Sequence, residues 1–319
     1  MLLLLVPRPQ TSDLLRQGLS ALQRGDLAEA REDLEQASES DPRNPYVWSS
    51  LAETYLRLQD RDKALSAAGK AEKLGGDNPV LVHALGMFYL NAGDLDTGLK
   101  FAKRAADAHL SFEYANALLH QEDFTRAADV ITAALAQHPK DAQLTLALGV
   151  TRYGQRRFDD AIDLFLRTIE LQPDALQPYV FLGKMLDQAG ARLPKITTDF
   201  ERWAAANPDS GVAQLLLAKA LLASDEHSPR AADLLQRAVN LEPDNWEAHY
   251  QYGAVLESKH DYQAAATQLS TATQLAPNEA MPHYHLARVY DRLGESEKAR
   301  EQREIHSRLT NTHNPETKP

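Results

Sequence analysis

Small residues recur at a nearly constant interval along this chain of 319 residues. The first series consists of Ala30, Ala64, Gly98, Ala127, Ala161, Ala231, Ala265 and Ala299. The second series consists of Gly18, Ala52, Gly86, Ala115, Gly149, Gly183, Ala218, Gly253 and Ala287. Apart from one step of 29 residues in each series and one step of 70 in the first, every step is 34 or 35 residues. Two series with one period predict a repeat protein, in which each unit buries its apolar face by stacking on its neighbours.

The sequence of each unit predicts two helices. Trp48, Leu51 and Tyr55 are three and four residues apart, which places them on one apolar stripe of a helix. Ala52 lies beside that stripe, where a small side chain lets a paired helix cross closely. A proline such as Pro173 closes the unit, because proline lacks an N–H and disfavours helix in the residue before it.

The units resemble the tetratricopeptide repeat (TPR) in the spacing of Trp48, Leu51, Ala52, Tyr55 and Ala64, and of Ala161, Phe165 and Pro173. The resemblance covers about Thr11 to Leu309, and in its number of units the chain resembles bacterial proteins with many TPR units. It implies an all-α fold, a right-handed α-α superhelical solenoid of about nine helix-turn-helix units with a polar C-terminal capping helix. HEAT or armadillo repeats are a remote alternative, because they need about forty residues or more.

The expected domain organisation is one solenoid over residues 11–309. Its units run about 11–44, 45–78, 79–107, 108–141, 142–175, 176–210, 211–245, 246–279 and 280–309. The second helix of the last unit, Glu295 to Leu309, carries charges of both signs and is expected to cover the end of the array. Residues 1–10 form an apolar N-terminal segment, and residues 310–319 are expected to be a disordered tail.

Two units depart from the pattern. The step of 29 residues leads us to expect that the fourth unit has a clipped first helix beginning at about Ser111. In the sixth unit we expect Pro194 in the opening turn of the second helix, with Lys195 in place of the usual small residue and bulk supplied by Phe200 and Trp203. We therefore expect a local kink near Ser111 and a different packing of the helix after Pro194.

The compartment is left open by the sequence. The apolar run from Met1 to Val6 resembles the core of a truncated signal peptide, but it is short and has no basic leader. A cytoplasmic location is favoured, with export as the alternative. No apolar run is long enough to predict a transmembrane helix, and the absence of cysteine excludes disulfides and thiolate metal sites.

Composition and motifs argue against nucleic-acid binding and catalysis. A net charge of −11 repels phosphate backbones. The sequence contains no glycine-rich phosphate loop, no Gly-x-Ser-x-Gly elbow and no His-Glu-x-x-His. His283 and His285 point about 200° apart on a helix, so they are not expected to share a metal ion. We predict no enzyme activity and no cofactor.

Membership of the TPR family would imply that a protein partner binds along the concave face formed by the first helices. Carried over residue by residue, this places in the groove Tyr46, Leu56, Arg57, Met87, Asn91, Phe112, Asn116, Tyr153, Lys184, Lys219, Tyr250, Tyr284 and Arg288. A single tyrosine at such a place is as often a packing residue as a contact. The predicted function is a scaffold that binds a partner peptide or helix in this groove. The alternative is an architectural subunit of an envelope or secretion assembly, docked through its ends or convex face.

Two known groove chemistries are not expected. The carboxylate clamp that binds chaperone tails has a Lys one turn from an Asn, whereas Asn116 is preceded one turn earlier by Phe112. The asparagine ladder of the sugar-transferring relatives is also missing, because the corresponding places include Arg16, Ser50 and Phe181. The sequence therefore does not name the partner.

Overall fold

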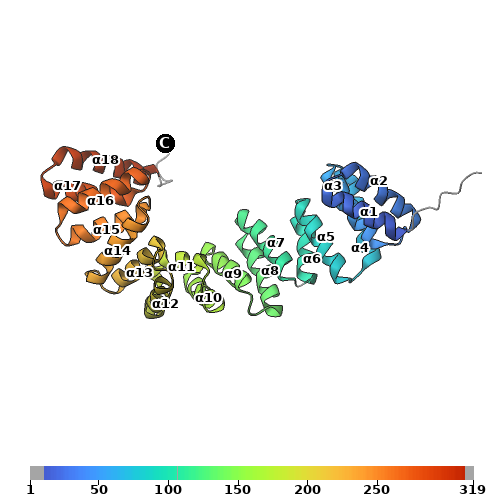
Figure 1. Cartoon of the computed structure of the whole chain (residues 1–319), viewed down its shortest axis with the longest axis horizontal. Coiled ribbons are helices and arrows are strands. Elements are labelled where there is room, and N and C mark those ends of the chain that lie inside the picture. Colours follow the sequence, from blue (N-terminus) through green and yellow to red (C-terminus); the bar gives the residue numbers. More distant parts are fainter. Residues whose placement is uncertain (1–10, 106, 313–319) are drawn as a thin grey trace, which may run out of the picture. The chain divides into compact units, whose positions relative to one another are not determined.

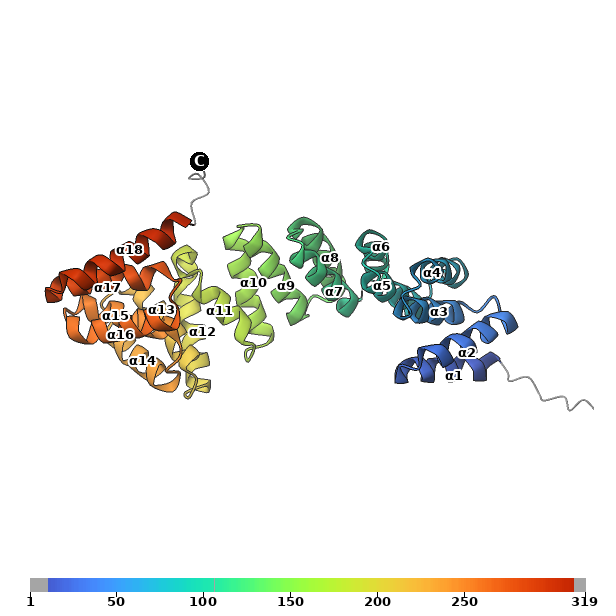
Figure 2. The same ribbon diagram turned by 90° about the horizontal axis from the view of Figure 1, so that it is seen from above.

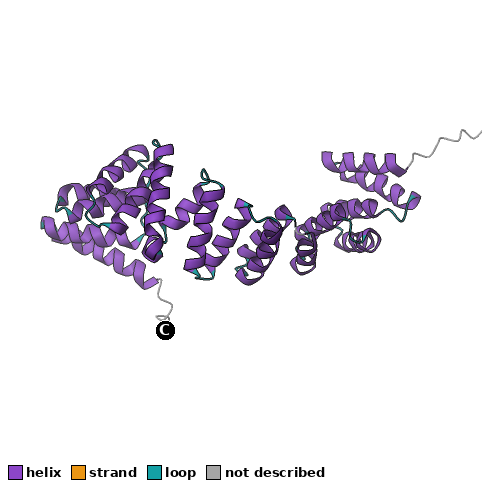
Figure 3. Cartoon of the chain, turned by 90° about the horizontal axis from the view of Figure 1, so that it is seen from below, coloured by secondary structure: helices purple, strands orange, loops and turns teal. Residues whose placement is uncertain are grey.

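The computed structural model describes residues 11–105 and 107–312, and these residues are almost entirely helical. They contain eighteen α-helices, two short 3-10 helices and no strand (Figure 3). The fold is an all-α superhelical repeat fold, as the sequence predicted. The predicted N-terminal segment, residues 1–10, lies outside the described residues, as do residues 313–319.

The chain forms two compact units, 1–157 and 158–319. The division falls inside the predicted fifth repeat rather than at Ser111 or Pro194. Unit 1 contains α1 (Thr11–Arg24), α2 (Leu27–Ser40), α3 (Pro45–Arg57), α4 (Arg61–Gly75), α5 (Pro79–Asn91), α6 (Leu95–Ala105), α7 (Ala108–His120), α8 (Phe124–Gln137) and α9 (Ala142–Gly154) (Figure 1). Helices α1, α3, α5, α7 and α9 contact one another in turn and form the first-helix face of unit 1.

Unit 2 is built in the same way. It contains α10 (Phe158–Leu171), α11 (Leu176–Gly183), η1 (Leu186–Gln188), η2 (Gly190–Arg192), α12 (Leu193–Ala206), α13 (Gly211–Ser224), α14 (Pro229–Leu241), α15 (Trp246–Ser258), α16 (Tyr262–Leu275), α17 (Ala280–Leu293) and α18 (Ser296–Thr312) (Figure 2). Helices α11, α13, α15 and α17 contact in turn and form the first-helix face of unit 2.

The helices begin where the sequence supplies N-caps. The side chain of Asn44 accepts a hydrogen bond from the Tyr46 N–H, and Asn78 accepts from Val80 and Leu81. Proline follows each of these asparagines at the first helical position, where its fixed φ and missing N–H carry no penalty. Local chemistry therefore fixes these starts independently of packing.

A third series marks the turns between paired helices. Gly25, Gln59, Gly93, Glu122, Arg156, Gly190, His260 and Gly294 all have positive φ, from 52° to 84°. These residues are 34 residues apart, except for the same 29-residue step and one interval of 70. Four of them, Gln59, Glu122, Arg156 and His260, are not glycine, so the backbone at these four positions carries some strain. The variety of residue types hides this series from a sequence search for small residues.

A fourth series is a hydrogen bond to the carbonyl of the proline that precedes a first helix. The side chain six residues after the proline makes the bond, at distances of 2.9 to 3.3 Å. The pairs are Trp48 with Pro42, Tyr179 with Pro173, Gln214 with Pro208, His249 with Pro243 and His283 with Pro277. These carbonyls lie between helices, so a side-chain donor takes the place of a helical N–H. His249 and His283 are thus buried packing residues.

This series makes a testable prediction at His249. His249→Leu removes the donor to the Pro243 carbonyl and should lower the free energy of unfolding by about 1 to 2 kcal/mol. His249→Gln should cost less, because Gln214 makes the equivalent bond in the preceding repeat. Urea unfolding followed by circular dichroism would measure both. Equal losses for the two variants would contradict a role for the hydrogen bond.

The predicted clipped helix at Ser111 is wrong. Helix α7 begins at Ala108 and has 13 residues, as do α3, α5 and α9. Asp107 caps it, accepting a hydrogen bond from the Leu110 N–H at 2.7 Å. The repeat is instead shortened in α6, which has only 11 residues, and in the short interval between the end of α6 at Ala105 and the start of α7. The predicted tail also begins too early, because α18 continues to Thr312.

The sixth repeat is partly as predicted. Helix α12 begins at Leu193 with Pro194 in its first turn, and Phe200 and Trp203 are buried. The expectation for Lys195 is wrong: its side chain is half exposed, whereas Ile196, 35 residues from both Ala161 and Ala231, is fully buried. An isoleucine cannot pack at the helix separation that alanine allows, so the crossing must adapt.

Candidate functional site

The first-helix face of unit 2 has a hollow beside the end of its shortest α-helix. Helix α11 has 8 residues and stops at Gly183, and the chain continues into the 3-10 turn η1. The open space has a volume of about 410 Å³ and is lined by residues of α11, η1, α13 and α15. Lys184 and Asp187 border it and are exposed. The early end of α11 is not signalled in the sequence.

Lys219 of α13 also lines this hollow. Its Nζ is 2.5 Å from Oε1 of Glu247 on α15, and only 14% of its side chain is exposed. The aliphatic stem of Lys219 is therefore packed against the protein, while its ammonium group pairs with a carboxylate of the neighbouring helix α15. The hollow thus combines one fixed ion pair with two exposed charges of opposite sign.

A cluster of polar and aromatic side chains continues this face across α15 and α17. Glu257 is only 9% exposed in its side chain, and its Oε2 is 2.6 Å from Nδ1 of His285. Its Oε1 is 3.1 Å from Nε of Arg288. The rings of Tyr250 and Tyr284 each meet the His285 ring edge-on, with centroids 5.5 Å apart. Burial raises the pKa of Tyr250, with a further contribution from the Glu257 charge.

The candidates in unit 1 lie on α3, α5, α7 and α9. Tyr46, Arg57 and Asn91 are exposed, whereas the other candidates, Leu56, Met87, Phe112, Asn116 and Tyr153, are half-buried. The Arg57 guanidinium donates to Oε1 of Glu53 at 2.9 Å and to the Leu22 carbonyl at 3.2 Å. Much of its hydrogen-bonding capacity is therefore used within the chain.

Sequence reasoning missed a pair of stacked histidines on the same face. The rings of His83 on α5 and His109 on α7 are stacked with centroids 6.2 Å apart. Nδ1 of His83 is 3.3 Å from Asp107, and Nδ1 of His109 is 3.9 Å from Glu113. The pairing depends on two repeats meeting, which a single repeat does not reveal.

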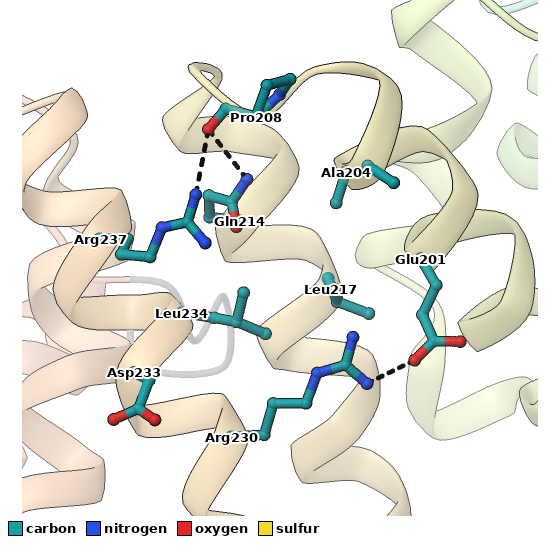
Figure 4. A pocket seen from close by; sticks show the side chains of 10 residues that line it. Glu201, Ala204, Pro208, Gln214, Leu217, Arg230, Asp233, Leu234 and Arg237 are labelled. Carbon is teal, nitrogen blue, oxygen red and sulfur yellow. Dashed lines mark hydrogen bonds and ion pairs between the residues drawn. The ribbon is translucent and has the colours of Figure 1, made fainter.

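Two further hollows lie beside second helices. In unit 2 a space of about 340 Å³ separates α12 from α14, with Ala204, Leu217 and Leu234 among its apolar walls (Figure 4). Arg230 on its rim is paired with Glu201 at 2.5 Å (Figure 4). In unit 1 a larger space of about 820 Å³ is lined mainly by residues of α8. Neither hollow contains a residue of the predicted groove.

Among residues 11–105 and 107–312, no three His, Asp or Glu side chains are arranged to hold a metal ion. His283 contacts Gln302 and the Pro277 carbonyl, while His285 contacts Glu257, so the two rings are directed to different partners. None of the helices described is both long and apolar enough to cross a membrane.

The family model of the tetratricopeptide repeat matches residues 15–79, 112–175, 215–280 and 255–304. These matches cover more than half of the sequence. The chain belongs to the TPR family. The resemblance seen in the spacing of small residues is thereby confirmed. The TPR repeats support a role as a protein–protein interaction scaffold.

Three known proteins illustrate the similarity. Peroxisome biogenesis protein 5 of Arabidopsis thaliana is 27% identical over 157 residues, which is 47% of this chain and 21% of that protein. The peroxisomal targeting signal receptor of Komagataella phaffii is 25% identical over 176 residues, 50% of this chain and 30% of the receptor. The chain thus spans less than a third of either relative.

The third is a solved structure, the C-terminal part of a TPR repeat-containing protein from Cytophaga hutchinsonii. It has a TM-score of 0.52 and 14% identity, and the match covers 85% of this chain and 99% of that one. At this identity the similarity concerns the fold alone.

Proposed function

We propose that this TPR scaffold binds an extended or helical segment of a partner protein along the first-helix face of unit 2. The observation that carries the proposal is that five groove candidates, Lys184, Lys219, Tyr250, Tyr284 and Arg288, lie on or directly after helices that contact in turn. They border a solvent-open hollow and an aromatic cluster. Tyrosine and arginine are enriched among the residues that contribute most to interface energy.

Two further points support a segment as the ligand. The first-helix face offers exposed charges of both signs beside rings, which suits a peptide with mixed side chains. The Komagataella relative is by name a receptor for a targeting signal. A segment of another protein is therefore the kind of ligand that we propose for this chain.

Selection from a displayed library of short random peptides on the full chain would supply a probe. For a selected peptide we expect Tyr284→Ala to weaken binding at least about tenfold, because it removes an exposed aromatic anchor. Fluorescence anisotropy would measure the dissociation constant. Asp233→Asn on α14 serves as the control, since Asp233 lies at the second-helix hollow. Circular dichroism would verify that both variants fold.

The second candidate is docking through the second helices. It is favoured by the hollow between α12 and α14, where Arg237 lies 3.5 Å from the Pro208 carbonyl above an apolar wall (Figure 4). If Asp233→Asn and Arg237→Gln abolish binding of the selected peptides while Tyr284→Ala leaves it unchanged, the groove proposal is wrong and this candidate takes its place.

A further inference from the structure

Arg288 of α17 has one side of its guanidinium group held in place. Nε lies 3.1 Å from Oε1 of Glu257, and the guanidinium carbon lies 5.6 Å from the centre of the Tyr284 ring, one turn earlier on the same helix. The side chain is nevertheless 53% exposed. Among the described residues, Glu257 is the one carboxylate that pairs with Arg288. A planar guanidinium anchored in this way is pre-organised for a further partner.

The carboxylate beneath Arg288 is not available to that partner. Glu257 is nearly buried and already contacts both His285 and Arg288. Arg288 therefore presents a positive edge to solvent, and the exposed carboxylate of Asp291, three residues later on α17, is paired with Arg303 at 2.6 Å. An anion that approaches this edge meets two parallel N–H donors, the geometry that matches a carboxylate.

Exposed apolar and aromatic side chains lie on the same face of α17, N-terminal to Arg288. Met281 and Tyr284 are 49% and 41% exposed, and they precede Arg288 by two turns and one turn on α17. His306 of α18 lies against Tyr284, with ring centroids 5.5 Å apart. Met281, Tyr284 and Arg288, which we call the α17 patch, combine the side chains that are enriched at protein interfaces.

Other cations of the first-helix face are more fully occupied. Arg57 uses both Nε and Nη1 on its own chain, and Lys219 is 14% exposed and paired with Glu247. Lys184 is exposed, but Asp187 borders the same hollow and offsets its charge. Arg288 thus combines an anchored guanidinium with a free edge.

We infer that Arg288 binds the carboxylate of an aspartate or glutamate side chain within the partner segment, and that an apolar residue next to this acid packs on Met281 and Tyr284. The inference rests on the proposed function and specifies the chemistry of its ligand. A side chain is the source of the carboxylate because the first-helix face continues from the α17 patch across α15 to the hollow at Lys219, so a bound segment runs past Arg288.

The test uses the peptide library on the full chain, displayed so that the C-terminus of each peptide is blocked. We expect the selected peptides to share an Asp or Glu close to an aromatic or aliphatic residue. Arg288→Gln should weaken binding of such a peptide about tenfold or more. Arg288→Lys should weaken it nearly as much, because lysine keeps the charge but lacks the planar fork. Arg300→Gln on α18 makes the same charge change on a 72% exposed side chain and serves as the matched control.

A double-mutant cycle shows whether the two groups touch. Replacing the shared acid of the peptide by its amide should weaken binding to the natural protein, but should have little further effect on Arg288→Gln. Additive losses would overturn the inference. The inference would also be overturned if the selected peptides shared no acidic residue. The same holds if peptides from a library with free C-termini bound only through the terminal carboxylate.

These failures leave the proposed function standing if Tyr284→Ala still weakens binding at least about tenfold. If no selected peptide depends on Tyr284, Tyr250 or Lys219, the proposed function itself is wrong. Melting curves of Arg288→Gln and Arg300→Gln would exclude unfolding as the cause of lost binding. If Arg288→Gln unfolds at a lower temperature than the natural protein, the double-mutant cycle is measured with Arg288→Lys and the amide peptide instead.

Discussion

Replacing Gly98 by alanine is expected to lower the free energy of unfolding by about 3 kcal/mol, although alanine is normally the better helix former by about 1 kcal/mol. A Cβ atom on Gly98 would overlap the Oη and Cζ atoms of Tyr114 and lie 2.8 Å from its Cε1. The Tyr114 ring is fully buried, and its hydroxyl donates to the Gly86 carbonyl at 2.7 Å. The ring therefore cannot retreat without losing a buried hydrogen bond. Urea unfolding followed by circular dichroism would measure the loss.

Gly69 provides the matched control for this substitution. It lies in α4, and outside the neighbouring backbone of that helix no atom comes within 4 Å of the position of its Cβ. Gly69→Ala should therefore raise the free energy of unfolding by about 0.5 to 1 kcal/mol. The double variant Gly98→Ala with Tyr114→Phe should lose less than the sum of the two single losses, because phenylalanine lacks the hydroxyl that the new methyl meets. A stabilising Gly98→Ala would contradict the packing described for α6.

The period of the chain could be predicted from sequence, whereas the reason for individual small residues could not. Gly98 belongs to the small-residue series, but only the structure shows that the side chain it admits is Tyr114 of the next repeat. The donors to the proline carbonyls were missed for a different reason. Trp48, Tyr179 and His283 make the same bond with different chemistry, so no residue type marks the position. The fixed offset of six residues after the proline was the available signal.

The candidate site was predicted in part for the same reason. The family resemblance assigns groove residues within one repeat, but the side-chain contacts that fix them join neighbouring repeats. Lys219 reaches Glu247 and Glu257 reaches His285, each 28 residues further along the chain. Tyr114 reaches the Gly86 carbonyl over the same separation. A search for complementary residues 28 apart would have found these pairs, whereas the hollow at Gly183 depends on where α11 stops.

The packing of α12 makes the second large prediction. Phe200 is fully buried and lies 5.8 Å from the Tyr179 ring, which stacks on Trp203 at 4.6 Å. These three rings therefore join the short helix α11, which has 8 residues, to α12. Phe200→Ala should therefore lower the free energy of unfolding by about 3 to 5 kcal/mol.

Phe200→Leu distinguishes lost volume from a specific need for a ring. It keeps most of the buried volume and should cost less than about 1.5 kcal/mol. The chain has three tryptophans, so Trp203 and Trp48 are each followed in a background where the other two are replaced by phenylalanine. The transition seen through Trp203 should move further than that seen through Trp48, because repeat arrays transmit destabilisation only partly to distant repeats. Equal shifts of the unfolding transition seen through Trp203 and Trp48 would mean that the two compact units unfold together. A loss of less than about 1 kcal/mol in the free energy of unfolding of Phe200→Ala would mean that the three rings do not hold α12 in place.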